Sequence, residues 1–179
     1  MKAARLFTCF AATSVLALAA NAQQTAPNPV AAACGSTEAN FTIKHQPASP
    51  VPAQAPTGKA LVYIVETMEE SGFATKKVNI GLDGQWLGAT DAATHIVFTV
   101  DPGVHHLCAV YQGEAVPMDA EGHTLLLHLN AEAGKIYFFR YHAIFLKESP
   151  GLAFFEPVDE DEGTYLTQGT DIATSTLKK

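Results

Sequence analysis

The chain has 179 residues, of which 47% are hydrophobic and 16% charged, and its formal net charge is −7 at pH 7. It contains 11 basic and 18 acidic residues, so it lacks the basic surplus with which proteins neutralise nucleic-acid phosphates or anionic membrane surfaces. We therefore expect no binding to nucleic acid. The length of the chain suits one folded domain.

The first 22 residues have the features of a secretory signal peptide. A basic start, Lys2 and Arg5, precedes an apolar stretch, and small residues ending at Ala22 form a cleavage site. We predict a mature chain that begins at Gln23 and is exported to the periplasm or the cell exterior, where it associates with the envelope. No later run approaches the roughly 18 apolar residues of a membrane-spanning helix, so we expect no transmembrane segment.

Residues 23–58 are predicted to form an N-terminal segment outside the main domain. Residues 23–33 are small and polar, which favours irregular structure. Residues 40–45, NFTIKH, alternate apolar and polar side chains as a short strand does. The following stretch, QPASPVPAQAPTG, is rich in proline, which excludes a helix or a central strand and predicts an extended connector.

Residues 59–158 are rich in short β-strand patterns separated by turn signals. Asp83 and Gly84 form the pair favoured in two-residue type I′ hairpins, and Asp101, Pro102 and Gly103 form a second turn with glycine at a positive-φ position. No long helical period separates the strands, and a parallel sheet would need crossover helices. We therefore predict an all-β fold, an antiparallel β-sandwich of about seven or eight short strands.

Residues 159–179 are predicted to form a short helix and a mobile tail. Asp159 and Glu162 have the spacing of a helix capping box, and the acidic residues suit a helix N-terminus. We expect Tyr165 and Leu166 to pack on the sandwich. The polar sequence after Gln168 predicts a mobile C-terminus.

The mature chain contains two cysteines, Cys34 and Cys108, since Cys9 lies within the signal peptide. An exported protein folds in an oxidising compartment, so we predict a disulfide between them that clamps the N-terminal segment to a core strand. The small residues before Cys34 leave a second interpretation open, in which this cysteine carries a lipid anchor.

The histidines do not have the spacing of a metal site. Side chains alternate along a strand, so the adjacent His105 and His106 face opposite ways, and so do His123 and His128. We predict no catalytic residue, no metal and no cofactor. One alternative stays open, a periplasmic metal-binding protein or metallohydrolase whose ligands come from His106, His123, His128 and His142, with His106 meeting a histidine of another strand.

Several segments together resemble a bacterial family. GKALVYIVE, VNIGLDGQWLGAT, FTVDPGVHHLCAVYQ, EAGKIYFFRY and FFEPVDEDEG are similar to proteins carrying "domain of unknown function 2846", from about Cys34 to Thr167. The resemblance implies an all-β, envelope-associated protein without catalytic residues, often a lipoprotein, and related PEGA-like modules serve as surface-layer or binding domains. We therefore expect a non-enzymatic envelope protein with a structural or recognition role toward a protein or a glycan.

Overall fold

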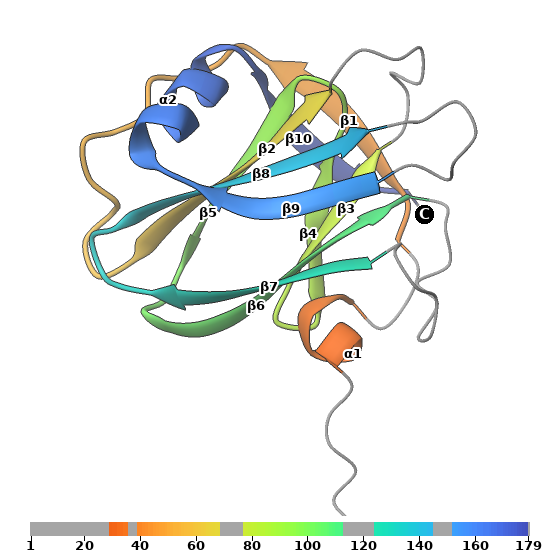
Figure 1. Ribbon diagram of the computed structural model, residues 1–179, viewed down its shortest axis with the longest axis horizontal. Helices are drawn as coiled ribbons and strands as arrows, with labels where there is room; N and C mark the ends of the chain where they lie inside the picture. Colours follow the sequence, from red (N-terminus) through yellow and green to blue (C-terminus); the bar gives the residue numbers. More distant parts are fainter. Residues whose placement is uncertain (1–28, 36–38, 69–76, 113–123, 145–151, 179) are drawn as a thin grey trace, which may run out of the picture.

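A computed structural model describes residues 29–35, 39–68, 77–112, 124–144 and 152–178. Among these residues, ten strands form two sheets that pack face to face, and two short helices lie on opposite sides of the sandwich (Figure 1). The predicted all-β, sandwich-like fold with a short C-terminal helix is confirmed. Of the helices among these residues, none is long and apolar enough to cross a membrane.

The larger sheet has six strands in the order β1-β10-β5-β2-β8-β9. Its strands are β1 (Phe41–Gln46), β2 (Ala60–Met68), β5 (Thr94–Val100), β8 (Ile136–Ile144), β9 (Leu152–Val158) and β10 (Asp171–Leu177). The smaller sheet is antiparallel and has the order β4-β3-β6-β7. Its strands are β3 (Val78–Leu82), β4 (Gln85–Thr90), β6 (Gly103–Tyr111) and β7 (Thr124–Ala131).

Two strand pairs of the larger sheet depart from the expected antiparallel arrangement. β2 runs parallel to β8, and β10 runs parallel to β5. A parallel pair needs a long crossover connection, which is usually helical. Between β2 and β8 the chain instead forms β3, β4, β6 and β7, the four strands of the smaller sheet. The second layer of the sandwich therefore supplies the crossover connection for this pair.

The main core lies between the two sheets. Alternate residues of β2, among them Val62 and Ile64, are fully buried against Ile80 of β3 and Leu107 of β6. The opposite face of β2 carries Tyr63, which packs in a second cluster on the outer side of the larger sheet. Helix α2 (Glu160–Gln168) covers part of that outer side.

The capping and the packing of α2 can be followed residue by residue. The Asp159 carboxylate accepts a hydrogen bond of 2.9 Å from the Glu162 backbone N–H, which is the N-cap half of the predicted capping box. Arg140 of β8 binds Glu162 at 2.8 Å, and Gly163 lies so close to β8 that a Cβ there would overlap the ring of Phe138. The prediction that Tyr165 packs on the sandwich is wrong, because this side chain is 75% exposed.

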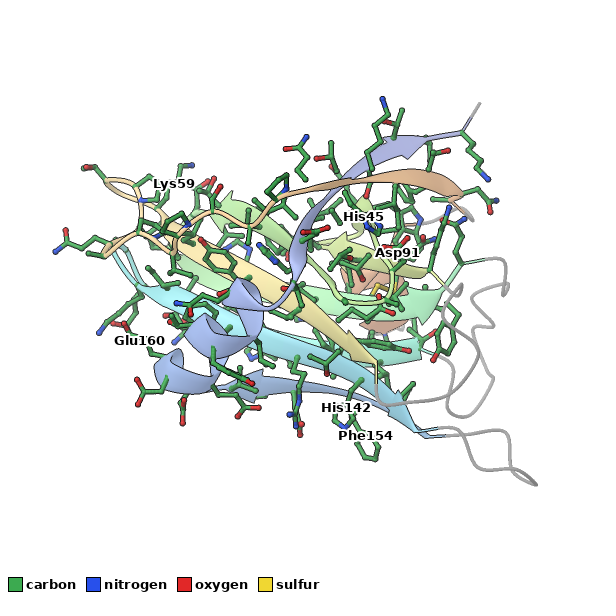
Figure 2. The ribbon with its side chains drawn as sticks, turned by 90° about the horizontal axis from the view of Figure 1, so that it is seen from above. His45, Lys59, Asp91, His142, Phe154 and Glu160 are labelled. Carbon is green, nitrogen blue, oxygen red and sulfur yellow. A yellow bond between two sulfur atoms is a disulfide. The ribbon has the colours of Figure 1, made fainter. Side chains whose placement is uncertain are left out.

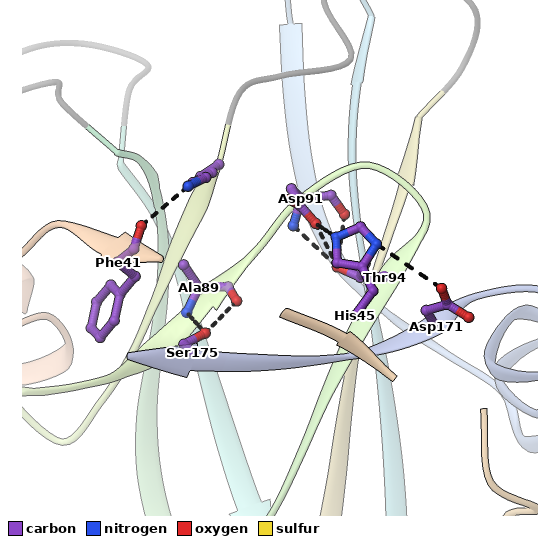
Figure 3. Close-up of polar contacts among 8 residues, drawn as sticks. Phe41, His45, Ala89, Asp91, Thr94, Asp171 and Ser175 are labelled. Carbon is purple, nitrogen blue, oxygen red and sulfur yellow. Dashed lines mark hydrogen bonds and ion pairs between the residues drawn. The ribbon is translucent and has the colours of Figure 1, made fainter. Parts of the chain in front are cut away.

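The prediction of a mobile C-terminal tail is also wrong, because residues 171–177 form β10. This strand pairs with β1 over six residues, and Ser175 both donates to the Ala89 carbonyl at 2.7 Å and accepts from its N–H at 2.8 Å (Figure 3). His45 of β1 adds a 2.8 Å contact to Asp91 and lies 4.0 Å from Asp171 (Figure 3). The tail is ordered by pairing with distant strands rather than by an apolar pattern of its own.

A second correction concerns the N-terminal segment. Residues 29–33, expected to be irregular, form the short helix α1 (Pro29–Ala33), which lies against β6 and β7. The predicted signal peptide and the predicted mature N-terminus, Gln23, lie outside the described residues. The predicted strand over residues 40–45 is present as β1, which also takes in Gln46, the first residue of the proline-rich connector; residues 47–58 of that connector contain neither helix nor strand.

Candidate functional site

Cys34 and Cys108 form a disulfide, as predicted, with their Cα atoms 5.5 Å apart. Both residues are fully buried, and together with Ala33 they make a small cluster against which Val30 and Trp86 pack. The bridge therefore fastens α1 to β6 from inside the protein. The Cys34 sulfur is engaged in this bond, so the structure favours the disulfide over the lipid-anchor interpretation.

The two predicted turns have the expected backbone. Asp83 and Gly84 both have positive φ, at 48° and 79°, which is the requirement of a type I′ hairpin turn. Gly103 has φ of 139°, so the glycine of the second turn also adopts a conformation that other residues avoid. These turns lie at the same end of the smaller sheet, and His105 connects them.

His105 and His106 point to opposite faces of β6, as predicted. The His105 ring nitrogens lie 2.6 Å from Asp83 Oδ2 and 2.7 Å from the Asp101 carbonyl oxygen. Burial lowers the pKa of His105, but these two contacts and the charges of both aspartates outweigh it, so the pKa is raised. His105 therefore has a structural role and joins the two turns.

Of the four histidines of the alternative metal hypothesis, the three that lie within the described residues do not all converge. His142 lies in the larger sheet, where its ring stacks on Phe154 with centroids 4.7 Å apart (Figure 2). His123 lies outside the described residues. His106 and His128, however, are direct cross-strand neighbours on β6 and β7, with ring centroids 5.3 Å apart. No group of three or more potential metal-ligating side chains occurs within the described part of the chain.

A cavity of about 450 Å³ opens at the C-terminal end of α2. Its lining combines aromatic, hydroxyl, amide, carboxyl and apolar groups, from Glu66, Thr67, Ala93, Tyr165, Leu166, Gln168, Gly169 and Thr170. A volume of this size falls within the range of small-molecule sites, roughly 300–1,000 Å³. Of the residues that line it, Ala93 has φ of 58°, a left-handed conformation that is uncommon outside glycine.

Glu66 is the buried acid of this region. It is 2% exposed, and it follows Val62 and Ile64 at alternate positions of β2, so its side chain is on the face toward the smaller sheet. Its Oε2 has no hydrogen-bond partner among the described residues. Burial raises the pKa of the Glu66 carboxyl to about 8, the charge of Asp91 acts in the same direction, and the Thr90 hydroxyl opposes them. The group is therefore largely protonated at pH 7.

A threonine and a histidine meet beside the cavity in a way that resembles a nucleophile and its base. His95 Nδ1 lies 2.9 Å from Thr170 Oγ1, and the imidazole is buried. The Thr170 hydroxyl donates to the Leu166 carbonyl at 3.0 Å, so its proton is already used and His95 must donate to it. Burial also lowers the pKa of His95. This arrangement fixes the end of α2 and does not activate the hydroxyl.

Sequence reasoning did not identify Glu66, His95 or Thr170. The sequence signal for a buried Glu66 is its place in LVYIVE. Alternate residues of a strand share one face, so Glu66 lies on the same face as Val62 and Ile64. His95 and Thr170 lie 75 residues apart, so their contact depends on the parallel pairing of β5 with β10.

No family model, no curated protein and no solved structure matches this chain. The resemblance to the envelope family described above therefore stays a prediction.

Proposed function

We propose that this protein is a non-enzymatic recognition module of the cell envelope that binds an uncharged, hydroxyl-rich ligand of the neutral glycan type. The features of residues 1–22 support export, and a buried disulfide between Cys34 and Cys108 fits an oxidising compartment. The proposed binding site is the cavity at the C-terminal end of α2.

One observation carries the proposal: the side chain of Tyr165 is 75% exposed and borders a cavity of about 450 Å³ whose other lining residues are polar or apolar, with Glu66 the one acid among them. A tyrosine presents a flat apolar face and a polar tip, which suits the mixed surface of a sugar. The Gln168 amide and the Thr67 hydroxyl can exchange hydrogen bonds with ligand hydroxyls.

The charge of the lining favours a neutral ligand. None of the lining residues is a lysine, an arginine or a histidine, so an anionic ligand would find no opposite charge among them. The one acid, Glu66, is largely protonated at pH 7 because burial raises its pKa to about 8. A cationic ligand therefore gains little from it as well.

The surroundings of the cavity support binding rather than catalysis. The hydroxyl that could act as a nucleophile, on Thr170, donates its proton to the Leu166 carbonyl, and His95 approaches it as a donor. A general base must instead accept the proton of its nucleophile. The proposal therefore predicts a ligand that leaves the cavity unchanged.

Calorimetric titration with chito-, cello- and malto-oligosaccharides, and with an oligogalacturonate as the anionic comparison, tests the proposal. We expect saturable binding of at least one neutral oligosaccharide and none of the anionic one. Tyr165→Ala should weaken that binding about tenfold or more, whereas Tyr165→Phe should retain most of it because the ring remains. Leu126→Ala, an exposed substitution on the other sheet, is the matched control. Binding that is equal in wild type and Tyr165→Ala, or release of cleaved sugar, would contradict the proposal.

A further inference from the structure

The paired histidines of the smaller sheet have no part in the proposed recognition site. His106 on β6 and His128 on β7 are both exposed and occupy directly opposite positions. Two exposed imidazoles on one sheet face, from strands that the fold holds in register, place two sets of ring nitrogens side by side at the surface.

The backbone places these two side chains as close together as a sheet allows. The His106 carbonyl accepts from the Asp83 N–H at 2.9 Å, and the His106 N–H donates to Asp83 Oδ1 at 2.9 Å. Both backbone groups of His106 therefore face away from β7, which makes His106 and His128 a non-hydrogen-bonded pair. In such pairs the Cα atoms are about 4.5 Å apart and the side chains are closer than in hydrogen-bonded pairs.

The ring spacing can be compared with that of a metal complex. With a metal–nitrogen bond of about 2.05 Å, two imidazoles on a tetrahedral ion have ring centroids about 5.2 Å apart, and two at a right angle about 4.5 Å apart. The centroids of His106 and His128 are 5.3 Å apart. The centroid separation is therefore that of tetrahedral coordination, so the strands need not move and rotation of the side chains suffices to turn the nitrogens toward one ion.

We propose that His106 and His128 form a two-histidine site for a zinc-like divalent cation, in which water or a partner's side chain completes the coordination. Imidazole nitrogen is a preferred ligand of such ions. The histidines border a recess of about 190 Å³ between β7 and α1, lined also by Pro29, Ala33, Leu126 and Leu127. This volume leaves room for the ion and its remaining ligands, because a water molecule occupies about 30 Å³.

The surroundings fix one ligand more firmly than the other. Asp83 binds the His106 backbone and, through its other oxygen, the His105 ring, so the strand beside His106 is held in place. Helix α1, which forms the far wall of the recess, is fastened to β6 by the Cys34–Cys108 disulfide. The site thus lies on two paired strands and one stapled helix, which is a more rigid support than a loop.

Zn²⁺ titration of the tag-free protein, followed by NMR through the imidazole C–H signals, tests the site. We expect the His106 and His128 signals to move together and to saturate at one equivalent of Zn²⁺, while the His142 signals stay in place. By calorimetry, His106→Ala and His128→Ala should each weaken binding about tenfold or more, and the double variant should be little weaker than either, because one remaining imidazole cannot chelate. His142→Ala is the control.

Three results would overturn the proposal. They are movement of the His45 signals instead of the pair, independent and non-saturating shifts of His106 and His128, and unchanged affinity in the single variants. The wild-type NMR titration identifies the ligands without any substitution, so it decides the matter even where a variant fails to fold. Because the recess and the cavity beside Tyr165 share no lining residue, failure of this site leaves the glycan proposal untouched.

Discussion

His105 and Asp83 form an ion pair in which imidazole Nδ1 lies 2.6 Å from carboxylate Oδ2. The other ring nitrogen lies 2.7 Å from the Asp101 carbonyl oxygen, which can only accept a hydrogen bond, so both nitrogens donate and the ring is positively charged. Burial disfavours the charge of either group, yet their contact raises the pKa of His105 and lowers the pKa of Asp83. His105 therefore links the β3–β4 turn, through its ion pair with Asp83, to the turn between β5 and β6, through the Asp101 carbonyl.

The pH dependence of this link follows from the two shifts. The contribution of His105 is complete below its unfolded pKa of about 6.5 and is lost as the pH rises through its raised folded value. We predict that His105→Gln lowers the free energy of unfolding by about 1 kcal/mol at pH 6 and by less at pH 9. The value is small because Asp83 is partly exposed and solvent screens the ion pair. A double-mutant cycle with Asp83→Asn in urea at both pH values measures the coupling, and equal coupling at both would contradict the charged pair.

Glu66 predicts a pH effect from its burial alone. Its folded pKa of about 8 lies above the unfolded value, so its stabilising contribution is complete at low pH and is lost as the pH rises through about 8. We predict that the free energy of unfolding of the wild type falls as the pH rises from about 5 to about 8. This fall should be steeper than that of Glu66→Gln by up to about 1.4 kcal/mol per pH unit. Denaturant melts across this range measure the difference, with Glu132→Gln as an exposed control. Parallel curves for wild type and Glu66→Gln would show that the carboxyl is ionised in the folded protein.

The disulfide predicts a local release of the N-terminus. Closing a loop of 74 residues stabilises a protein by about 4.5 kcal/mol on the chain-entropy estimate. A bridge that alone held the N-terminal segment would, when removed in Cys34→Ser, free everything before Lys59. Strand β1 is, however, also paired with β10 over six residues, which should hold it in place without the bridge. We now predict early proteolytic cleavage before residue 39 in Cys34→Ser, with later cleavage in the connector after Gln46. Equally rapid cleavage at both places would mean that the bridge also holds β1.

Strand β7 predicts unequal effects of two neighbouring substitutions. Leu127 packs against the core cluster between the sheets, whereas Leu126 is 42% exposed on the opposite face. A carboxylate at position 127 would be placed against the core without a partner, so Leu127→Asp should lose several kcal/mol, while Leu126→Asp should change stability by about 0.5 kcal/mol or less. Urea melts of the two variants decide between this and a strand buried on both faces, for which both losses would be large.

The features that could be predicted from sequence are those determined by residues close together in the chain or by the number of cysteines available to pair. The Asp83-Gly84 turn needs two adjacent residues with positive φ, the cap of α2 needs Asp159 and Glu162 three residues apart, and two cysteines allow one bridge. Each depends on chemistry within a few residues or on the number of partners available.

The features that could not be predicted depend on pairing across long stretches of chain. The sequence DIATSTL looks like a tail because its order comes from β1 and β5, more than 70 residues away. The meeting of His106 with His128 depends on the register of β6 against β7, which a one-residue slip would change. The burial of Glu66 depends on how the second sheet covers β2, which no local pattern states.

The most direct test of the recognition proposal is an NMR titration of the isotope-labelled protein with the neutral oligosaccharide that binds best by calorimetry. We predict saturable backbone shifts concentrated at residues 165–170, Thr67 and Ala93, around the cavity beside the exposed side chain of Tyr165, with the sugar recovered intact. Shifts centred on any other surface, or the appearance of cleaved sugar during the titration, would contradict it.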